Sequence, residues 1–246
     1  MGYDNSEERL MQKGLLENVR VLDLTRVVAG PHATTMLADM GADVVKLEEP
    51  IIGDDLRGRK YKGRSPQHED YFNANNRSKR SITLNLKDPE ERLIGQDLAA
   101  KADVVIENFA PGTVDKLGIG WEVVRKKNPR VIYCSISGFG QTGPYRNRLA
   151  LDPVIQAVSG VMSVTGYDGQ EPLMIGAPLC DVVAGMYAAF AIVCALPDAV
   201  RTGIGRYIDV SMQEAMLAVL GPRLGETLQA GDNPPRLGNA NALRVK

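Results

Sequence analysis

In the first 140 residues, short runs of valine, isoleucine and leucine alternate with segments of helical spacing. The predicted strands are VRVLDLT (19–25), DVVKLEE (43–49), RSITLNL (80–86), DVVIENF (103–109) and VIYCSIS (131–137), and the predicted helices cover 30–42, 88–102 and 113–129. Strands that alternate with helices of ten or more residues favour right-handed crossovers between parallel strands. The sequence therefore predicts an α/β fold with a Rossmann-like, doubly wound and mostly parallel sheet.

Two regions depart from this alternation. Residues 50–76 contain several glycines and a dense run of charge, which predicts a long functional loop. After residue 150 the pattern predicts an apolar helix, turns, a buried core helix from Asp181, the strand RYIDVS and the helix MQEAMLAVLG. The uncharged run 182–197 is shorter than the roughly 20 residues of a membrane span. We expect a lead-in over 1–18, a large domain over 19–225 and a linker over 226–246.

The charge and cysteine content exclude several classes of function. With 29 basic and 30 acidic residues, the net charge of −1 provides no global attraction to nucleic acid or to an anionic membrane. Cys134, Cys180 and Cys194 are widely spaced, and His32 and His68 are the only histidines, so neither a disulfide framework nor a metal site is expected. The acidic N-terminus has no apolar leader pattern, and we expect a reducing, cytoplasmic setting.

The segment SGFGQTGP carries a G-x-G-x-x-G pattern at Gly138, Gly140 and Gly143, directly after a predicted strand. A dinucleotide fingerprint needs a helix that begins at the third glycine. Here Pro144 begins a turn-rich segment instead, so NAD binding is not expected. The backbone N–H groups of this turn are still suited to a carbonyl or carboxylate oxygen.

Basic residues gather in three places, and a polar turn lies near one of them. Taken alone, each cluster is typical of a solvated surface. The turn ENFAPG favours a ligand site over a solvated surface. Asn108 and Phe109 follow a predicted strand and are suited to hold a purine-like ring, and Lys116 lies further along the chain. The clusters are Arg57, Arg59, Lys60, Lys62 and Arg64; then Arg77, Lys79 and Arg80; then Lys116 and residues 125–127.

Asp181 precedes the uncharged helix and has two interpretations. As an N-cap, its carboxylate would accept hydrogen bonds from the first N–H groups of the helix. As a nucleophile, it would be a carboxylate held at a helix N-terminus beside the small residues of MIGAPLC. No G-x-S-x-G elbow competes with it.

Together these segments resemble the family III CoA-transferases, which include formyl-CoA, carnitine and succinate- or glutarate-linked CoA-transferases. The resemblance runs from about Val19 to the end. It rests, in the family's order, on VLDLTRVVAGPHATTMLADMGADVVKLEEP, GDDLR, NNRSKRSITLNL, DVVIENFAPGTVDKLGIG, VIYCSISGFGQTGP, GAPLCDVVAGMYA and TGIGRYIDVSMQEA.

The resemblance implies a reaction and a set of site residues. Asp181 corresponds to the catalytic aspartate, and Gln141 corresponds to a residue near the acyl group. Coenzyme A is implied as a co-substrate, a small carboxylic acid as the second substrate, and an interlocked homodimer as the assembly, with no permanently bound cofactor. Glu49 stands where some relatives use an arginine for the phosphates. The implied CoA contacts are Val28, Lys79, Arg80, Asn108, Phe109 and Lys116.

On this basis we expect Asp181, ionised at pH 7 from a reference pKa of about 3.9, to attack an acyl-CoA thioester and form an anhydride. CoA thiolate would then give an aspartyl-CoA thioester, which the acceptor acid consumes. Backbone N–H groups at 138–143, including those of Gly138, Gly140 and Gln141, are the expected oxyanion donors.

Two departures leave alternatives open. Related acyl-CoA racemases carry a histidine where this chain has Leu151, beside Asp152, so racemisation lacks one base and is the second reading. Family members are also much longer, and part of their acyl pocket lies beyond the equivalent of this chain. The alternative is therefore a CoA-binding fragment that is not catalytic or that needs a partner chain.

Overall fold

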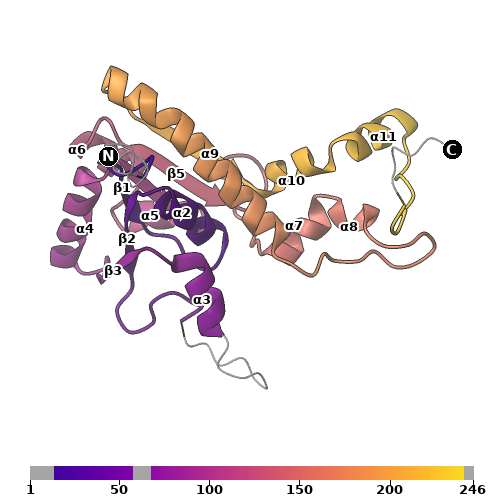
Figure 1. Ribbon diagram of the computed structural model, residues 1–246, viewed down its shortest axis with the longest axis horizontal. Coiled ribbons are helices and arrows are strands. Elements are labelled where there is room, and N and C mark those ends of the chain that lie inside the picture. Colours follow the sequence, from indigo (N-terminus) through magenta and orange to yellow (C-terminus); the bar gives the residue numbers. More distant parts are fainter. Residues whose placement is uncertain (1–13, 58–67, 241–246) are drawn as a thin grey trace, which may run out of the picture.

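The computed structural model describes residues 14–57 and 68–240, which form a six-stranded sheet with helices on both faces (Figure 1). Every strand pair in this sheet is parallel, and the order is β3-β2-β1-β4-β5-β6. The strands are β1 (Arg20–Asp23), β2 (Asp43–Glu48), β3 (Arg80–Thr83), β4 (Val104–Glu107), β5 (Ile132–Ser137) and β6 (Arg206–Ser211). The predicted α/β fold with a Rossmann-like parallel sheet is confirmed.

The strand order reverses between β1 and β4. From β1 the chain builds outward through β2 and β3, and from β4 it builds in the opposite direction through β5 and β6. In open parallel sheets, this reversal leaves a crevice at the carboxyl ends of the two central strands, and ligands bind there. A ligand site is therefore expected at the loops that follow β1 and β4.

Two hydrophobic clusters separate the helices into layers. One cluster joins one face of the sheet to α2 (Ala29–Asp39), α9 (Leu179–Thr202) and α10 (Met212–Leu220). The other joins the opposite face to α4 (Pro89–Lys101), α5 (Thr113–Lys116) and α6 (Trp121–Lys127). In Figure 1, α7 (Asp152–Val158), α8 (Val161–Val164) and α11 (Pro222–Ala230) extend to one side of the sheet.

Two predicted segments differ from the observed elements. The segment 113–129 is divided into α5 and α6, because Gly118 takes a left-handed φ of 70° just after α5 ends. The loop predicted over 50–76 contains a helix, α3 (His68–Asn76), which has no glycine or proline and packs beside α2. Buried Phe72 anchors α3, so a sequence with few apolar residues still forms an element. The basic residues 59–64 lie outside the described residues.

The predicted core helix is longer than expected. Helix α9 runs for 24 residues and continues through Pro197, where the uncharged run ends. One side is buried, whereas Met186, Phe190 and Val200 on the other side are exposed. Among the described helices, α9 is the one whose length and composition would suffice to cross a membrane. Its buried residues repeat at helical spacing, as in a helix that packs on a sheet.

The close approach of α9 to α2 depends on one glycine. A Cβ added at Gly185 would lie 2.6 Å from the carbonyl oxygen of Ala29, the first residue of α2. The first residue of α2 therefore contacts α9 at its seventh residue, Gly185. At the C-terminal end, α11 continues to Ala230, so the segment expected as a linker from 226 begins as helix.

Candidate functional site

The turn between β1 and α2 is held by side chains from three other parts of the chain. The Lys46 ammonium donates to the Thr25 carbonyl oxygen at 2.7 Å. The Asn108 amide contacts both backbone groups of Arg26, and the Asp54 carboxylate accepts from the Val27 N–H. Three consecutive residues are therefore fixed from outside the turn. Such a turn presents its side chains and free N–H groups in one arrangement.

Asn108 follows β4, so it faces the β1 turn across the point where the strand order reverses. Its Oδ1 accepts from the Arg26 N–H and its Nδ2 donates to the Arg26 carbonyl oxygen, both at 2.8 Å. The sequence predicted that this amide holds a purine-like ring. In the structure the amide instead ties the two central loops together, and its hydrogen-bonding atoms already have these partners.

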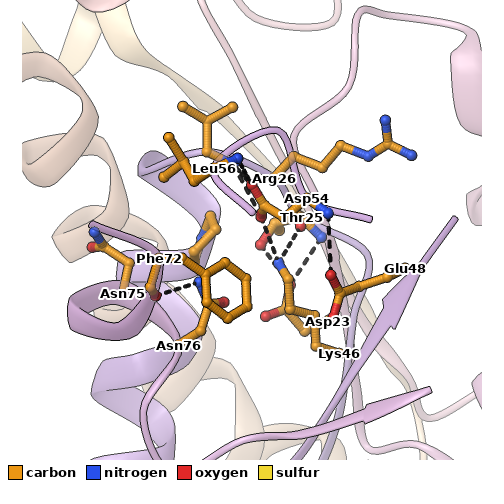
Figure 2. Close-up of polar contacts among 12 residues, drawn as sticks. Asp23, Thr25, Arg26, Lys46, Glu48, Asp54, Leu56, Phe72, Asn75 and Asn76 are labelled. Carbon is orange, nitrogen blue, oxygen red and sulfur yellow. Dashed lines mark hydrogen bonds and ion pairs between the residues drawn. The ribbon is translucent and has the colours of Figure 1, made fainter. Parts of the chain in front are cut away.

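A buried ionic network supports the turn from below, and Figure 2 draws it. The Lys46 ammonium lies 3.0 Å from the Asp54 carboxylate, and both side chains are almost completely buried. Glu48 accepts two hydrogen bonds from Arg57, at 2.6 and 2.8 Å, and one from the Asp54 N–H. Arg57 therefore belongs to this network, and the loop that carries Asp54 is fastened to the end of β2.

A cavity of about 350 Å³ lies beside the turn, on the face covered by α4 and α5. It is mainly apolar, with one aromatic wall formed by Phe109. The Arg26 guanidinium lies 5.2 Å from the centre of that ring. Lys116 is exposed in the same helix as the lining residue Thr113. The lining residues are Leu24, Arg26, Leu47, Glu49, Ile52, Leu84, Asn85, Leu86, Lys87, Phe109, Thr113 and Leu117.

Asp181 lies on the other side of the turn, in the first turn of α9. It is one helical turn before Gly185, so it stands about 6 Å along the axis above the point where α9 meets Ala29. Val28, which is buried, caps α2 beside Ala29 without a side-chain hydrogen bond. Residue 181 therefore lies one helical turn of α9 before the point where this helix contacts the beginning of α2.

The electrostatic surroundings of Asp181 differ from those expected. Burial, with a smaller contribution from the charge of Asp152, raises the pKa of Asp181 to about 7. The carboxyl group is therefore close to half ionised at pH 7, not fully ionised. The N-cap interpretation of Asp181 is wrong, because α9 begins at Leu179 and Pro178 is its N-cap.

Asp152 performs the capping role from another helix. Its Oδ2 accepts from the N–H groups of Cys180 and Asp181, at 2.7 and 3.2 Å. Its Oδ1 accepts from the Gln156 amide at 2.6 Å. Gln156 is fully buried and also bonds the backbone of residues 175 and 177. The segment that leads into α9 is therefore fastened to α7.

Lys79 and Arg80, which the resemblance implies as CoA contacts, each pair with a carboxylate of this chain. The Lys79 ammonium is buried and donates to Asp23 at 3.1 Å, to Asn76 and to two backbone carbonyl oxygens. Burial lowers the pKa of Lys79, with Asp23 opposing, and Lys79 helps to lower the pKa of Asp23 to about 2 despite its burial. Arg80 begins β3 and pairs with Asp43 at the start of β2, at the edge opposite the crevice. The structure does not bring Arg80 to the cavity.

The glycine turn after β5 is divided between the two faces. Gly138 approaches Ala150, and a Cβ there would lie 2.0 Å from that methyl group. Gly140 has a φ of 82°, and the Gln141 N–H that follows donates to Asp209 at 2.9 Å. The Gln141 side chain lines a second cavity, with Trp121, Tyr133 and Tyr207, on the side of α5 and α6. It is therefore on the face opposite α9.

Three residues of this site were not predicted as site residues from the sequence: Arg26, Lys87 and the anchoring residue Asp54. Arg26 could have been found, because it directly follows a predicted strand just as Asn108 does. Lys87 also follows the strand predicted over 80–86. Asp54 offered no such signal, since its role depends on a distant backbone group.

Comparison with known proteins shows the family to which the chain belongs. The family model described as CoA-transferase family III matches residues 16–244. The chain belongs to the CoA-transferase family III. The resemblance seen in the sequence is therefore confirmed.

Relatives and solved structures support the same membership. The chain is 44% identical over 236 residues to a succinate–glutarate CoA-transferase of Agrobacterium fabrum, covering 94% of this chain and 59% of that protein. It is 44% identical over 228 residues to an acetyl-CoA:oxalate CoA-transferase of Acetobacter aceti, covering 92% of this chain and 58% of that protein. A crystal structure of a CAIB/BAIF family protein from Brucella suis has a TM-score of 0.86 and 42% identity, with 94% and 61% of the two chains covered.

Proposed function

We propose that this chain is the CoA-binding, nucleophile-bearing part of an enzyme that moves CoA from an acyl-CoA thioester to a small carboxylic acid. The observation that carries the proposal is the position of Asp181, partly buried in the first turn of α9 and one helical turn before the residue at which α9 contacts the beginning of α2. Family membership supports the reaction type. The chain covers 59% and 58% of the two CoA-transferases named above, so the activity of the whole protein is part of the proposal.

The proposed CoA site follows the crevice across the turn. The adenine ring would lie in the cavity against Phe109, and the phosphates would contact Arg26, Lys87 and Lys116 near its mouth. The pantetheine arm would pass Val28 to bring the thioester to Asp181. Lys79 and Arg80 are not proposed as CoA contacts, because each already has a carboxylate partner.

In the proposed reaction, the carboxylate of Asp181 attacks the thioester carbonyl carbon and the carbon–sulfur bond breaks. This gives a mixed anhydride and CoA thiolate. The thiolate attacks the aspartyl carbonyl, which forms an aspartyl-CoA thioester and releases the donor acid as a carboxylate. The acceptor carboxylate then attacks this thioester, and the same steps in reverse transfer CoA to it. The reaction requires that water be excluded, because water would hydrolyse the anhydride.

The proposed oxyanion donors are the N–H groups of Ala29 and Gly30, in the first turn of α2. The first N–H groups of a helix have no partner within the helix, and the helix dipole makes this end partly positive. Ala29 is contacted by α9 at Gly185, one helical turn after Asp181, on the face of the sheet that α9 covers. The sequence favoured the glycine turn at 138–143 for this role, but the Gln141 N–H is already bonded to Asp209.

A trapping experiment tests the proposal. The chain is incubated with succinyl-CoA, treated with hydroxylamine and digested, and the peptide that contains Asp181 is analysed by mass spectrometry. We expect a hydroxamate at Asp181 and none in Asp181→Asn. Asp232→Asn, an exposed acid that follows α11, is the matched control and is expected to react like the wild type. Reaction with hydroxylamine that is undiminished in Asp181→Asn would refute the nucleophile.

A second candidate is a chain that binds CoA but transfers it only with a partner chain. This candidate is supported by the coverage of the relatives, because the chain spans less than two thirds of their length. For this candidate, we expect calorimetry to show CoA binding to the 246-residue chain, and we expect no transfer of CoA from succinyl-CoA to glutarate. Robust transfer by the purified chain alone would exclude it.

A further inference from the structure

Val27 has a backbone conformation that valine seldom adopts. Its φ is 67°, in the left-handed region, where a β-branched side chain is strained. It stands between Arg26, which lines the cavity, and Val28, which caps α2. The conformation of this one residue therefore sets how the cavity side and the Asp181 side of the turn are oriented relative to each other.

The Asp54 carboxylate holds this conformation. Its two oxygens lie 3.2 and 3.3 Å from the Val27 N–H, and its Oδ1 also accepts from the Leu56 N–H at 3.0 Å. Asp54 is 1% exposed, so no water competes for these contacts. Its charge is balanced by Lys46 at 3.0 Å, and the same ammonium bonds the Thr25 carbonyl oxygen, two residues before Val27. Figure 2 shows Lys46 and Asp54 converging below this turn.

Asp54 is itself fixed by Glu48, the last residue of β2. Its N–H donates to Glu48 at 3.1 Å, and Glu48 is held by Arg57 and by the Ser81 hydroxyl at 2.6 Å. Arg57 in turn lies 3.8 Å above the ring of Phe72 in α3. The loop after β2 therefore holds the Asp54 carboxylate against the N–H group of Val27. The contacts that fix this loop are buried or half-buried.

We propose that Asp54 is a positioning residue for the CoA site, which acts by holding Val27 in the left-handed conformation that joins the two halves of the site. This inference rests on the proposed function for its ligand. Without the carboxylate, Val27 returns to a negative φ, the turn rearranges, and the CoA cavity and Asp181 no longer match one extended ligand.

A suppressor experiment tests the proposal, because glycine adopts a positive φ without strain. Asp54→Ala is expected to weaken CoA binding about tenfold, as expected for strain of this size. Val27→Gly alone is expected to change the affinity less than twofold, and Asp54→Ala combined with Val27→Gly is expected to recover most of the loss. The matched control is Ile51→Gly, because Ile51 is also β-branched with a φ of 79° but is fully exposed. It is expected to recover nothing.

Isothermal titration calorimetry with CoA on the full chain gives these affinities. If Asp54→Ala does not fold, Lys46→Met with Asp54→Ala replaces it, because no buried ammonium is then left unpaired, and Val27→Gly is added to that pair. Unchanged affinity in the Asp54 variant, or an equal loss with and without Val27→Gly, would overturn the positioning role.

Hydrogen exchange separates this inference from the proposed function. The Arg26 N–H, which bonds Asn108, is expected to exchange faster in Asp54→Ala and to return toward the wild-type rate when Val27→Gly is added. This readout needs no ligand. If the wild-type chain does not bind CoA, the proposed function fails, and the exchange rates alone support or overturn the positioning role.

Discussion

The backbone N–H of Asp181 donates a hydrogen bond to the carboxylate of Asp152, 3.2 Å away and 29 residues earlier in the chain. One acidic side chain therefore fixes the backbone of the proposed nucleophile and also places a negative charge near it. The charge and the partial burial of Asp181 both oppose its ionisation. Asp152 therefore affects both the position of the Asp181 backbone and the pKa of the Asp181 carboxyl group.

The first prediction concerns the pH dependence of trapping. Because the pKa of Asp181 is about 7 and the carboxylate is the reacting form, trapping by hydroxylamine should become about tenfold faster between pH 6 and pH 8. Asp152→Asn removes the nearby charge and should move the midpoint to lower pH. Asp232→Asn should leave it in place. A midpoint near pH 4 in the wild type would contradict the raised pKa.

The same raised pKa predicts a change in stability with pH. The folded chain holds a proton on Asp181 up to about pH 7, whereas the unfolded chain releases it near the ordinary value of 3.8. The folded state therefore binds more protons in this window, and its stability falls as pH rises through it. Asp181→Asn should gain stability relative to the wild type from pH 5 to pH 8. Urea denaturation at both pH values measures this, and an equal difference at both would contradict it.

The sequence predicts the sheet well because each strand and helix has a local pattern. Asn108 and Phe109 were also located correctly at a strand end, since the carboxyl edge of a parallel sheet follows from topology. The partners of Asn108 and of Lys79 were not predictable in the same way. Each forms hydrogen bonds across the fold, to Arg26 and to Asp23, and such pairings depend on packing rather than on sequence spacing.

The Asn108 amide provides a further prediction. Asn108→Ala removes both hydrogen bonds to Arg26, which should cost about 1–3 kcal/mol of stability and weaken CoA binding about tenfold. The matched control is Asn128→Ala, because the Asn128 amide likewise joins two backbone groups, those of Ala102 and Arg130, but at the opposite edge of the sheet. Thermal unfolding should show losses in both variants. Calorimetry should show weaker CoA binding in Asn108→Ala alone, and equal weakening in both would refute the role of the turn.

We expect Gln156 to stabilise the segment that leads into α9. Gln156→Leu leaves the Ile175 N–H and two carbonyl oxygens without their partner, so we expect a loss of about 3 kcal/mol or more in unfolding free energy. Gln229→Leu, at an exposed position in α11, should change it by no more than about 0.5 kcal/mol. Urea denaturation of the two variants measures the difference. Similar small effects in both would mean that the Gln156 contacts do not stabilise the fold.

The last prediction separates cations near the cavity from those elsewhere. Lys116 is exposed beside the cavity, and no ion pair holds it among the residues that the structure describes. Lys116→Ala should therefore weaken CoA about threefold to tenfold, with less effect at high salt, because the charge is available to a phosphate. Arg80→Ala should leave CoA affinity unchanged, since Arg80 pairs with Asp43 at the far edge of the sheet. Titrations at low and high salt test both variants. If Arg80→Ala weakened binding as much as Lys116→Ala, the phosphates would lie at the other edge, and the placement of CoA in this cavity would be wrong.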